Sequence, residues 1–115
     1  MPLDVRSGSA VFACDRSQRI VAWNQAAERL VGVPRAEAVG KFCWEVVRAS
    51  DPSGVLACGA RCSRARLGAH GWHVEPQELD VTGDQGRRRV LVDTLPVRDR
   101  ETGMVVHVLH PAPGG

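Results

Sequence analysis

The start of the chain shows two short apolar stretches separated by a polar break. Apolar residues dominate 9–15 and 19–23, a length and composition typical of buried β-strands. The break at 15–18, Asp-Arg-Ser-Gln, is rich in residues whose side chains bond their own backbone. The pattern therefore predicts two strands joined by a tight turn.

A helical pattern begins directly after the second strand. Asn24 belongs to a residue type that caps helix N-termini, because its side-chain oxygen can accept an orphan backbone N–H. Gly32 belongs to the type that ends helices in a left-handed conformation. The apolar positions between them fall at helical spacing: Ala27, Leu30 and Val31. The sequence therefore predicts a strand that leads straight into a capped helix.

The middle of the chain is predicted to hold helices. A proline just before 35–39 favours a short helix there, since proline is well tolerated in a first helical turn. The stretch 42–47 suits either a short helix or an extended piece, and a turn is predicted at 51–54, Asp-Pro-Ser-Gly. The apolar spacing of 55–68 predicts a longer helix, weakened by an internal glycine. Helices thus separate the first two strands from the rest of the chain.

The last part of the chain returns to strand patterns. Apolar residues in 72–74 and 79–81 have opposite parity, and Pro76 between them predicts a break or a bulge. The remaining elements are a hairpin turn at 83–86, strands at 87–97 and 104–110, and a turn at 99–103. Strands segregated from helices in this order predict an α+β domain with an antiparallel sheet. Eight residues are expected to be mostly buried: Ile20, Val21, Leu30, Val31, Leu91, Val92, Val106 and Val108.

Composition narrows the class of protein without changing this fold. With 115 residues, of which 43% are hydrophobic, the chain suits one domain with one packed core. The formal net charge of +2 is too balanced to favour direct nucleic-acid binding. No apolar run approaches the roughly 20 residues of a membrane span, and the first residues lack the apolar stretch of a secretory signal. We therefore expect a cytoplasmic protein whose cysteines stay reduced unless they take part in chemistry.

The run 15–32 resembles the opening of a PAS domain, in which a turn and a strand ending in Asn lead into a helix ending in Gly. The resemblance continues through 34–40 and the C-terminal strands, and it covers 9–110. It implies a five-stranded antiparallel sheet with short helices on one face. A lead-in segment at 1–8 and a linker tail at 111–115 would flank this domain.

The resemblance also implies a function. PAS domains are sensor modules that bind a small ligand or a cofactor and usually form dimers. They relay a conformational change to an output domain such as a transcription regulator or a histidine kinase. We therefore expect a non-enzymatic sensor that forms a homodimer, and the strand at 87–97 suits a subunit contact because both its faces carry apolar residues. The alternative is a ligand-free dimerisation module with a filled core and structural cysteines.

The cysteines are the sharpest chemical feature. Cys58 and Cys62 are spaced to share one face of a helix, where two thiolates can chelate one metal. Cys43 precedes a turn that can return it to that helix, and Cys14 or His107 is a candidate fourth ligand. Cysteine ligands select zinc or an iron–sulfur cluster, and some PAS sensors bind such a cluster through cysteines in this region. A metal site requires the three sulfurs to lie within about 4 Å of each other.

Other interpretations of the same residues stay open. Free cysteines are often buried as small hydrophobes, and thiols alone can also sense redox state. His70 and His73 are further candidate ligands, and His70 is a candidate axial ligand for haem. Trp44 and Asp93 are candidate pocket residues for a small ligand. No Ser/His/Asp order, paired carboxylates or phosphate-binding loop stands out, so we do not expect an enzyme.

Overall fold

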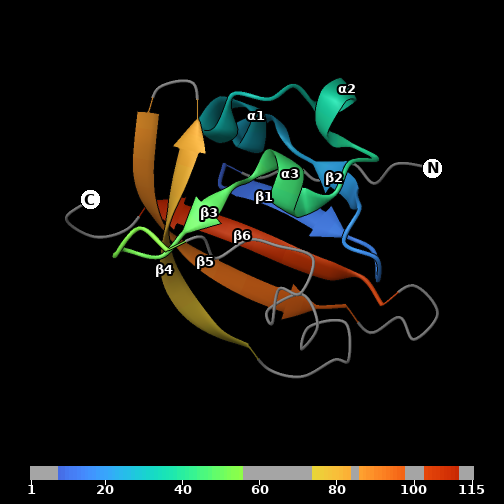
Figure 1. The fold of residues 1–115 in the computed structure, drawn as a ribbon. Coiled ribbons are helices and arrows are strands. Elements are labelled where there is room, and N and C mark those ends of the chain that lie inside the picture. Colours follow the sequence, from blue (N-terminus) through green and yellow to red (C-terminus); the bar gives the residue numbers. More distant parts are fainter. Residues whose placement is uncertain (1–7, 56–73, 84–85, 98–102, 112–115) are drawn as a thin grey trace.

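The computed structural model of the chain describes residues 8–55, 74–83, 86–97 and 103–111 (Figure 1). Its first two strands, β1 (Ala10–Cys14) and β2 (Ile20–Trp23), pair antiparallel. The predicted strand–turn–strand at the start of the chain is confirmed.

Helix α1 (Gln25–Val31) is capped by the residues that the sequence indicates. The Oδ1 atom of Asn24 accepts the N–H of Ala27, and Gly32 ends the helix in a left-handed conformation with φ of 82°. The same Asn24 oxygen accepts the N–H of Val11 at 2.9 Å. One side chain therefore both caps α1 and holds the helix against β1.

Two one-turn helices and a short strand follow: α2 (Arg35–Ala38), α3 (Cys43–Val46) and β3 (Ala49–Ser50). The segment that leads into α3 runs beside β2. The N–H of Gly40 donates to the carbonyl of Ile20, and the N–H of Ile20 donates to the carbonyl of Lys41, both at 2.8 Å. These bonds fix α3 next to the start of β2.

Three long strands follow: β4 (Val74–Gly83), β5 (Gly86–Pro96) and β6 (Val105–Pro111). The sequence predicts two pieces around Pro76, whereas β4 is one strand with a register shift between Val74 and Gln77. The irregularity accommodates the missing N–H of proline without ending the strand. All but the first residue of the helix predicted over 55–68 lies outside the described residues.

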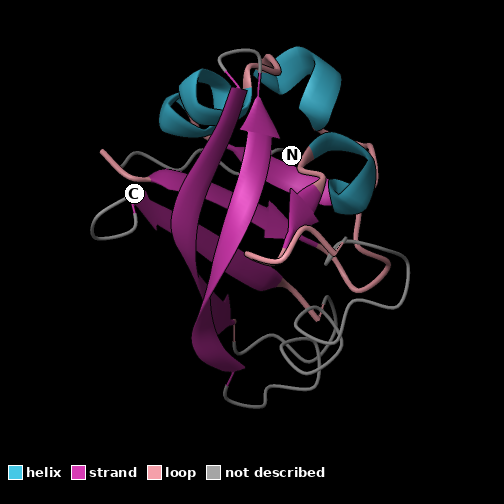
Figure 2. Ribbon diagram, turned by 60° about the vertical axis from the view of Figure 1, so that its left-hand side comes forward, coloured by secondary structure: helices cyan, strands magenta, loops and turns pink. Residues whose placement is uncertain are grey.

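The strands form one antiparallel sheet in the order β2-β1-β6-β5-β4-β3 (Figures 1 and 2). This sheet has six strands, one more than expected. The additional strand is β3, which pairs with β4 through Ala49–Val81 and Ser50–Asp80. A two-residue strand carries too little pattern to be recognised from sequence. The α+β class, with short helices on one face of an antiparallel sheet, is confirmed.

The end of β4 and the start of β5 lie near α1, and Figure 2 shows the ends of these two strands beside the helices. A Cβ atom on Gly83 would lie 2.7 Å from the carbonyl oxygen of Leu30 and 3.0 Å from that of Val31. Real side chains do not approach backbone oxygen this closely, so the contact requires glycine. The end of β4 therefore packs directly on the last turn of α1.

The two faces of the sheet differ in burial. We call the face that packs against the helices the inner face. Its core residues are Ala10, Phe12, Cys14, Leu79, Val81, Val90, Val92 and Leu109. The helices add Ala26, Ala27, Val31, Ala38 and Val46 to the same cluster. Every second residue of β5 and β6 points to the opposite, outer face and is only half-buried or exposed.

The expectation of eight buried residues is correct for Ile20, Val31 and Val92. It is wrong for the other five, which are half-buried: Val21, Leu30, Leu91, Val106 and Val108. Leu91, Val106 and Val108 alternate with fully buried neighbours and belong to the outer face. A strand with apolar residues on both faces does not reveal from its sequence which face turns inward.

Candidate functional site

A polar pair lies in the middle of the inner face. The Nδ1 atom of His107 on β6 and the hydroxyl oxygen of Thr94 on β5 are 3.1 Å apart, and both side chains are buried. The ring of Phe12 on β1 lies against His107 with 4.9 Å between ring centroids. Trp23 also packs on Phe12, with 5.5 Å between ring centroids, and the ring N–H of Trp23 donates to the carbonyl of Val33. Strand pairing thus assembles one aromatic and polar row across four strands, β5, β6, β1 and β2.

The position of His107 in this row differs from the metal-binding role that the sequence suggests for it. His107, a candidate metal ligand, instead shares a hydrogen bond with Thr94, a residue whose sequence context suggests no functional role. Thr94 has the same parity as buried Val92, and that parity is the signal that marks it as inward-facing. Buried polar groups need hydrogen-bond partners, and Thr94 and His107 satisfy each other within an otherwise apolar layer.

Two cysteines meet at the end of the same face. Cys14 is the last residue of β1 and is buried, and Cys43 is the first residue of α3 and is half-buried. The Cys14 thiol hydrogen-bonds the Cys43 sulfur. This hydrogen bond lowers the pKa of the Cys43 thiol from its ordinary value, burial opposes the shift, and the backbone N–H of Trp44 adds to it. The pair therefore brings together two of the four cysteines.

Two other candidate residues lie away from this inner-face site. Trp44 is half-buried and stacks on Phe42 with ring centroids 5.4 Å apart, while the guanidinium of Arg19 covers the Phe42 ring at 4.2 Å. Asp93 is a Cα partner of Val108 and points to the outer face, because buried Val92 and Thr94 on either side point inward. The fold does not direct Asp93 toward the row at His107.

Four further candidate ligands lie outside the described residues: Cys58, Cys62, His70 and His73. The convergence of Cys43 with Cys58 and Cys62 is therefore still a prediction. Among residues 8–55, 74–83, 86–97 and 103–111, no group of three His, Cys, Asp or Glu side chains could hold a metal ion.

A groove of about 860 Å³ opens between α1 and the adjoining ends of β1, β5 and β6. We call it the α1 groove. Its apolar lining is Ala10, Ala26, Leu30, Val90, Leu109 and Pro111. Its charged lining is Glu28, Arg29, Arg87, Arg88 and Arg89. The sequence shows the Arg87–Arg89 run, but only the folded hairpin places it beside the apolar residues of α1 and β6.

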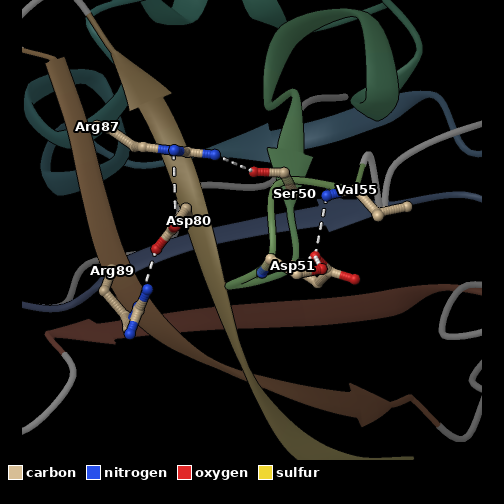
Figure 3. Close-up of polar contacts among 7 residues, drawn as sticks. Ser50, Asp51, Val55, Asp80, Arg87 and Arg89 are labelled. Carbon is tan, nitrogen blue, oxygen red and sulfur yellow. Dashed lines mark hydrogen bonds and ion pairs between the residues drawn. The ribbon is translucent and has the colours of Figure 1, made fainter.

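An acidic residue organises part of this basic run. Figure 3 shows Asp80 on β4 between two arginines of β5, with Arg89 Nε at 3.0 Å and Arg87 Nε at 3.5 Å from its carboxylate oxygens. Arg87 also donates to the hydroxyl of Ser50 at 3.2 Å. The hydrogen bond from Arg89, together with the two positive charges, holds the pKa of the Asp80 carboxyl below its usual range. The same bond raises the pKa of Arg89.

Two turns of the chain have the same construction. The Oδ1 of Asp15 accepts the N–H groups two and four residues ahead at 2.9 and 3.0 Å, and the Oδ1 of Asp51 does so at 3.0 and 2.9 Å. The fourth residue of each turn has positive φ, 69° at Gln18 and 95° at Gly54. The first turn leads into β2 beside the cysteine pair, and Figure 3 shows the second next to β3.

The described part of the chain is thus an antiparallel sheet whose inner face is covered by short helices and carries a buried polar pair. Residues 6–111 of the chain match the family model of the PAS fold. The chain belongs to the PAS family, and it is a PAS sensor domain. A comparison with curated protein sequences finds no match.

Solved structures agree on the fold. The LOV protein of Rhodobacter sphaeroides is similar with a TM-score of 0.71 and 18% identity over 96% of this chain. This chain spans only 63% of that protein. The PAS domain of an HTR-like protein from Haloarcula marismortui is similar with a TM-score of 0.66 and 19% identity, and the match covers 93% of this chain and 89% of that one. The PAS domain of the Cronobacter turicensis RpfR quorum-sensing receptor, in complex with BDSF, is similar with a TM-score of 0.66 and 16% identity. The match covers 93% of this chain and 96% of that domain.

The helices in the described part of the chain are all short. None of them is long and apolar enough to pass through a bilayer.

Proposed function

We propose that this PAS domain is a sensor module that binds a small amphipathic molecule in the α1 groove. The observation that carries the proposal is the lining of the groove, where apolar residues of the sheet and of α1 lie beside arginines. The complex of the similar RpfR domain with BDSF supports a small ligand for this fold. The bound ligand would shift the equilibrium between two conformations of the domain, and an output domain would sense that shift.

The floor of the groove favours the apolar part of such a ligand. Val90 and Leu109 have exposed fractions of only 2% and 3%, and they belong to the core cluster that Leu30 packs against. Because these two floor residues have almost no surface left to cover, the apolar contact comes from half-buried Leu30 and exposed Pro111. A ligand that covers them gains about 25 cal/mol for each Å² of apolar surface removed from water.

The rim of the groove favours an anionic group. Four arginines line it against one glutamate, Glu28. Asp80 binds Arg87 and Arg89, and of the other two arginines, Arg29 and Arg88, we choose Arg29 on α1 for the test. Arg29 is exposed, so its replacement leaves the core unchanged. A net positive rim raises the local concentration of anions and orients a ligand with one charged end.

The test uses the dye 1-anilinonaphthalene-8-sulfonate, which joins an apolar ring system to a sulfonate. We expect saturable binding to the folded chain, measured by fluorescence, and about tenfold weaker binding to Arg29→Glu, because a nearby charge is reversed. Lys41→Glu makes the same charge change at an exposed residue that does not line the groove, and it should leave the affinity unchanged. Equal weakening by both variants, or binding without saturation, would contradict the proposal.

We further propose that the domain works as a homodimer that contacts its partner through the outer face. Half-buried Val106 and Val108 lie on the outer face of β6, and Val106 is the Cα partner of Leu95 on β5, whose exposed fraction is 46%. Light scattering of the chain should show a dimer, and Val108→Arg should convert it to a monomer. Thr82→Arg, an exposed site on β4, is the matched control. A dimer that persists in Val108→Arg places the contact elsewhere.

The remaining functional expectations are also proposals. The module acts in the cytoplasm without enzymatic activity and passes its signal to an output domain such as a transcription regulator or a histidine kinase. If the dye does not bind and the chain still forms dimers, the ligand-free dimerisation module becomes the better description.

A cysteine-held zinc ion or iron–sulfur cluster is the second candidate cofactor. The contact between Cys14 and Cys43 favours it, because two potential thiolate ligands from different elements already lie together. Cys58 and Cys62 would have to complete the site. The ultraviolet–visible spectrum of anaerobically purified protein, with metal analysis, tests this candidate. A colourless protein with no bound zinc or iron would exclude it.

A further inference from the structure

Cys14 and Cys43 are far apart in sequence, and both are tied to the start of β2. Cys14 is the Cα partner of Ile20 in the sheet. The N–H of Cys43 donates to the carbonyl of Gln18 at 2.9 Å, and the carbonyl of Lys41 accepts the N–H of Ile20. Main-chain bonds on both sides therefore hold the two cysteines against the same short segment.

The two thiols differ in their access to solvent. Cys14 has an exposed fraction of 1% and faces the core, whereas Cys43 is half-buried at the start of α3. The Cys43 sulfur accepts a hydrogen bond from the Cys14 thiol and another from the N–H of Trp44. The two sulfurs are therefore in contact, and solvent can reach only that of Cys43.

We propose that Cys14 and Cys43 are an oxidisable thiol pair, in which a hydroperoxide oxidises Cys43 first and Cys14 then closes a disulfide with it. An exposed sulfur with a buried thiol in contact behind it is the arrangement that this chemistry needs. The cysteine that resolves the oxidised one requires no access to solvent, because the contact already exists.

The reaction balances with hydrogen peroxide as the oxidant. The Cys43 thiol first releases its proton to solvent. Its thiolate then attacks one peroxide oxygen, so that an S–O bond forms, the O–O bond breaks and hydroxide leaves, and this hydroxide takes up the released proton as the first water. The Cys14 thiol then attacks the Cys43 sulfenic sulfur, so that the S–S bond forms and the S–O bond breaks. The departing hydroxide takes the Cys14 proton as water. The two thiols lose two electrons, and one peroxide becomes two waters.

The disulfide would join the two layers of the domain. Cys14 ends a strand of the sheet and Cys43 begins a helix on its inner face. Oxidation would therefore lock the position of α3 over β1 and β2 by a covalent bond. This effect is independent of any ligand in the α1 groove, because neither cysteine lines that groove.

The sequence makes the test direct. Trypsin cuts after Lys and Arg, which places each of the four cysteines on a separate peptide. The full reduced chain is treated with hydrogen peroxide, blocked with iodoacetamide, digested without reductant and mapped by mass spectrometry. We expect one disulfide-linked pair, the peptide that contains Cys14 joined to the peptide that contains Cys43. The mass of the linked pair should be that of the two reduced peptides less two hydrogen atoms. Linkage of either residue to Cys58 or Cys62 instead, or recovery of both alkylated, would overturn the proposal.

Two variants separate the roles. In Cys14→Ala the Cys43 sulfenic acid should persist and be trapped by dimedone. In Cys43→Ala the oxidation of Cys14 should be about tenfold slower or more, because the buried thiol loses its accessible partner. Comparable oxidation of Cys14 in both the parent chain and Cys43→Ala would contradict the assigned order. The linked peptide in the unmodified chain keeps the test valid even if a variant folds poorly.

Discussion

The hydroxyl of Thr94 and the Nδ1 atom of His107 lie 3.1 Å apart on neighbouring strands at the centre of the inner face. The strand register places them directly opposite each other, and both are buried. Loss of one partner leaves the other in an apolar layer without the hydrogen bond that it had in the native protein.

Thr94→Val should therefore destabilise the domain, although the side chains have almost the same shape. We expect a loss of about 1–3 kcal/mol in the free energy of unfolding, measured by urea denaturation. The control is Thr82→Val, which makes the same chemical change at an exposed position of β4 and should cost less than about 0.5 kcal/mol. Equal effects at the two sites would mean that the bond to His107 does not contribute.

Asn24 joins α1 to β1 through its side chain. Its Oδ1 accepts the N–H groups of Ala27 and Val11 at 2.9 Å each, and its Nδ2 donates to the carbonyl of Ser9 at 2.8 Å. Asn24→Ala should cost about 2–4 kcal/mol in the free energy of unfolding, because it removes a cap and leaves buried partners unsatisfied.

Asn24→Asp separates the two contributions. Asp keeps the oxygen that caps α1 but cannot donate to Ser9, so this variant should be intermediate in thermal denaturation. Gln25→Ala, at the exposed next position, is the control. A stability of Asn24→Asp equal to that of Asn24→Ala would show that the donation to Ser9 carries the whole effect.

The ion pairs of Asp80 predict an acid-sensitive component of stability. The pKa of its carboxyl is lower in the folded protein, first because Arg89 hydrogen-bonds it, whereas an unfolded Asp has a pKa of about 3.9. Near that pH the unfolded chain binds more protons, so stability rises with pH there and is fully present above it. It is lost as the pH falls through the lowered pKa of the folded state.

Asp80→Asn should remove this component. We expect lower stability than the parent at neutral pH and a smaller decline in the melting temperature as the pH is lowered from 5 toward 3, a window set by the unfolded pKa of about 3.9. Glu45→Gln removes a carboxylate from an exposed site on α3 and should follow the parent curve more closely. A parallel decline in Asp80→Asn and the parent would mean that the ion pairs contribute nothing.

Core burial predicts a difference between two large aliphatic residues. Ile20 has an exposed fraction of 1%, whereas Leu30 is half-buried at the α1 groove. Ile20→Ala should cost about 2–5 kcal/mol in the free energy of unfolding, and Leu30→Ala should cost less, because part of its surface already contacts water. Urea denaturation of the two variants tests the order, and a larger loss for Leu30→Ala would reverse our assignment of the core.

Gly83 predicts a steric effect without any loss of contacts. In Gly83→Ala the new methyl group would meet the carbonyl oxygens of Leu30 and Val31, so backbone must move and stability should fall by about 1–3 kcal/mol. The control is Gly8→Ala, where a Cβ meets nothing within 4 Å. Gly83→Ala with unchanged thermal stability would show that the hairpin is not packed on α1 as described.

Local chemistry made part of this fold predictable. The cap at Asn24 and the end of α1 at Gly32 depend only on neighbours in the chain, and both are where the sequence places them. The inward face of β5 and β6 was not predictable in the same way. Leu91 and Val92 are both apolar, and only the position of the helices decides that Val92 is buried.

The candidate site depends still more on distant pairing. The cysteine pair arises because 40–43 runs beside β2, an arrangement fixed by hydrogen bonds between segments far apart in sequence. Spacing along the chain relates Cys58 to Cys62, but it contains no signal that relates Cys14 to Cys43. The alternation of β5 does mark Thr94 as inward-facing, once Val92 is known to be buried.

The fixing of α1 at both ends has a mechanical consequence. Its first turn is bound to β1 through Asn24, and its last turn rests on β4 at Gly83. A helix that is fixed at both ends cannot rotate outward about one end to make room for a ligand. A ligand that widens the α1 groove must instead change the curvature of the sheet to which both ends are attached. Because β5 and β6 belong to that sheet, the bending would also change the curvature of the outer face. The helices would keep their positions on the inner face.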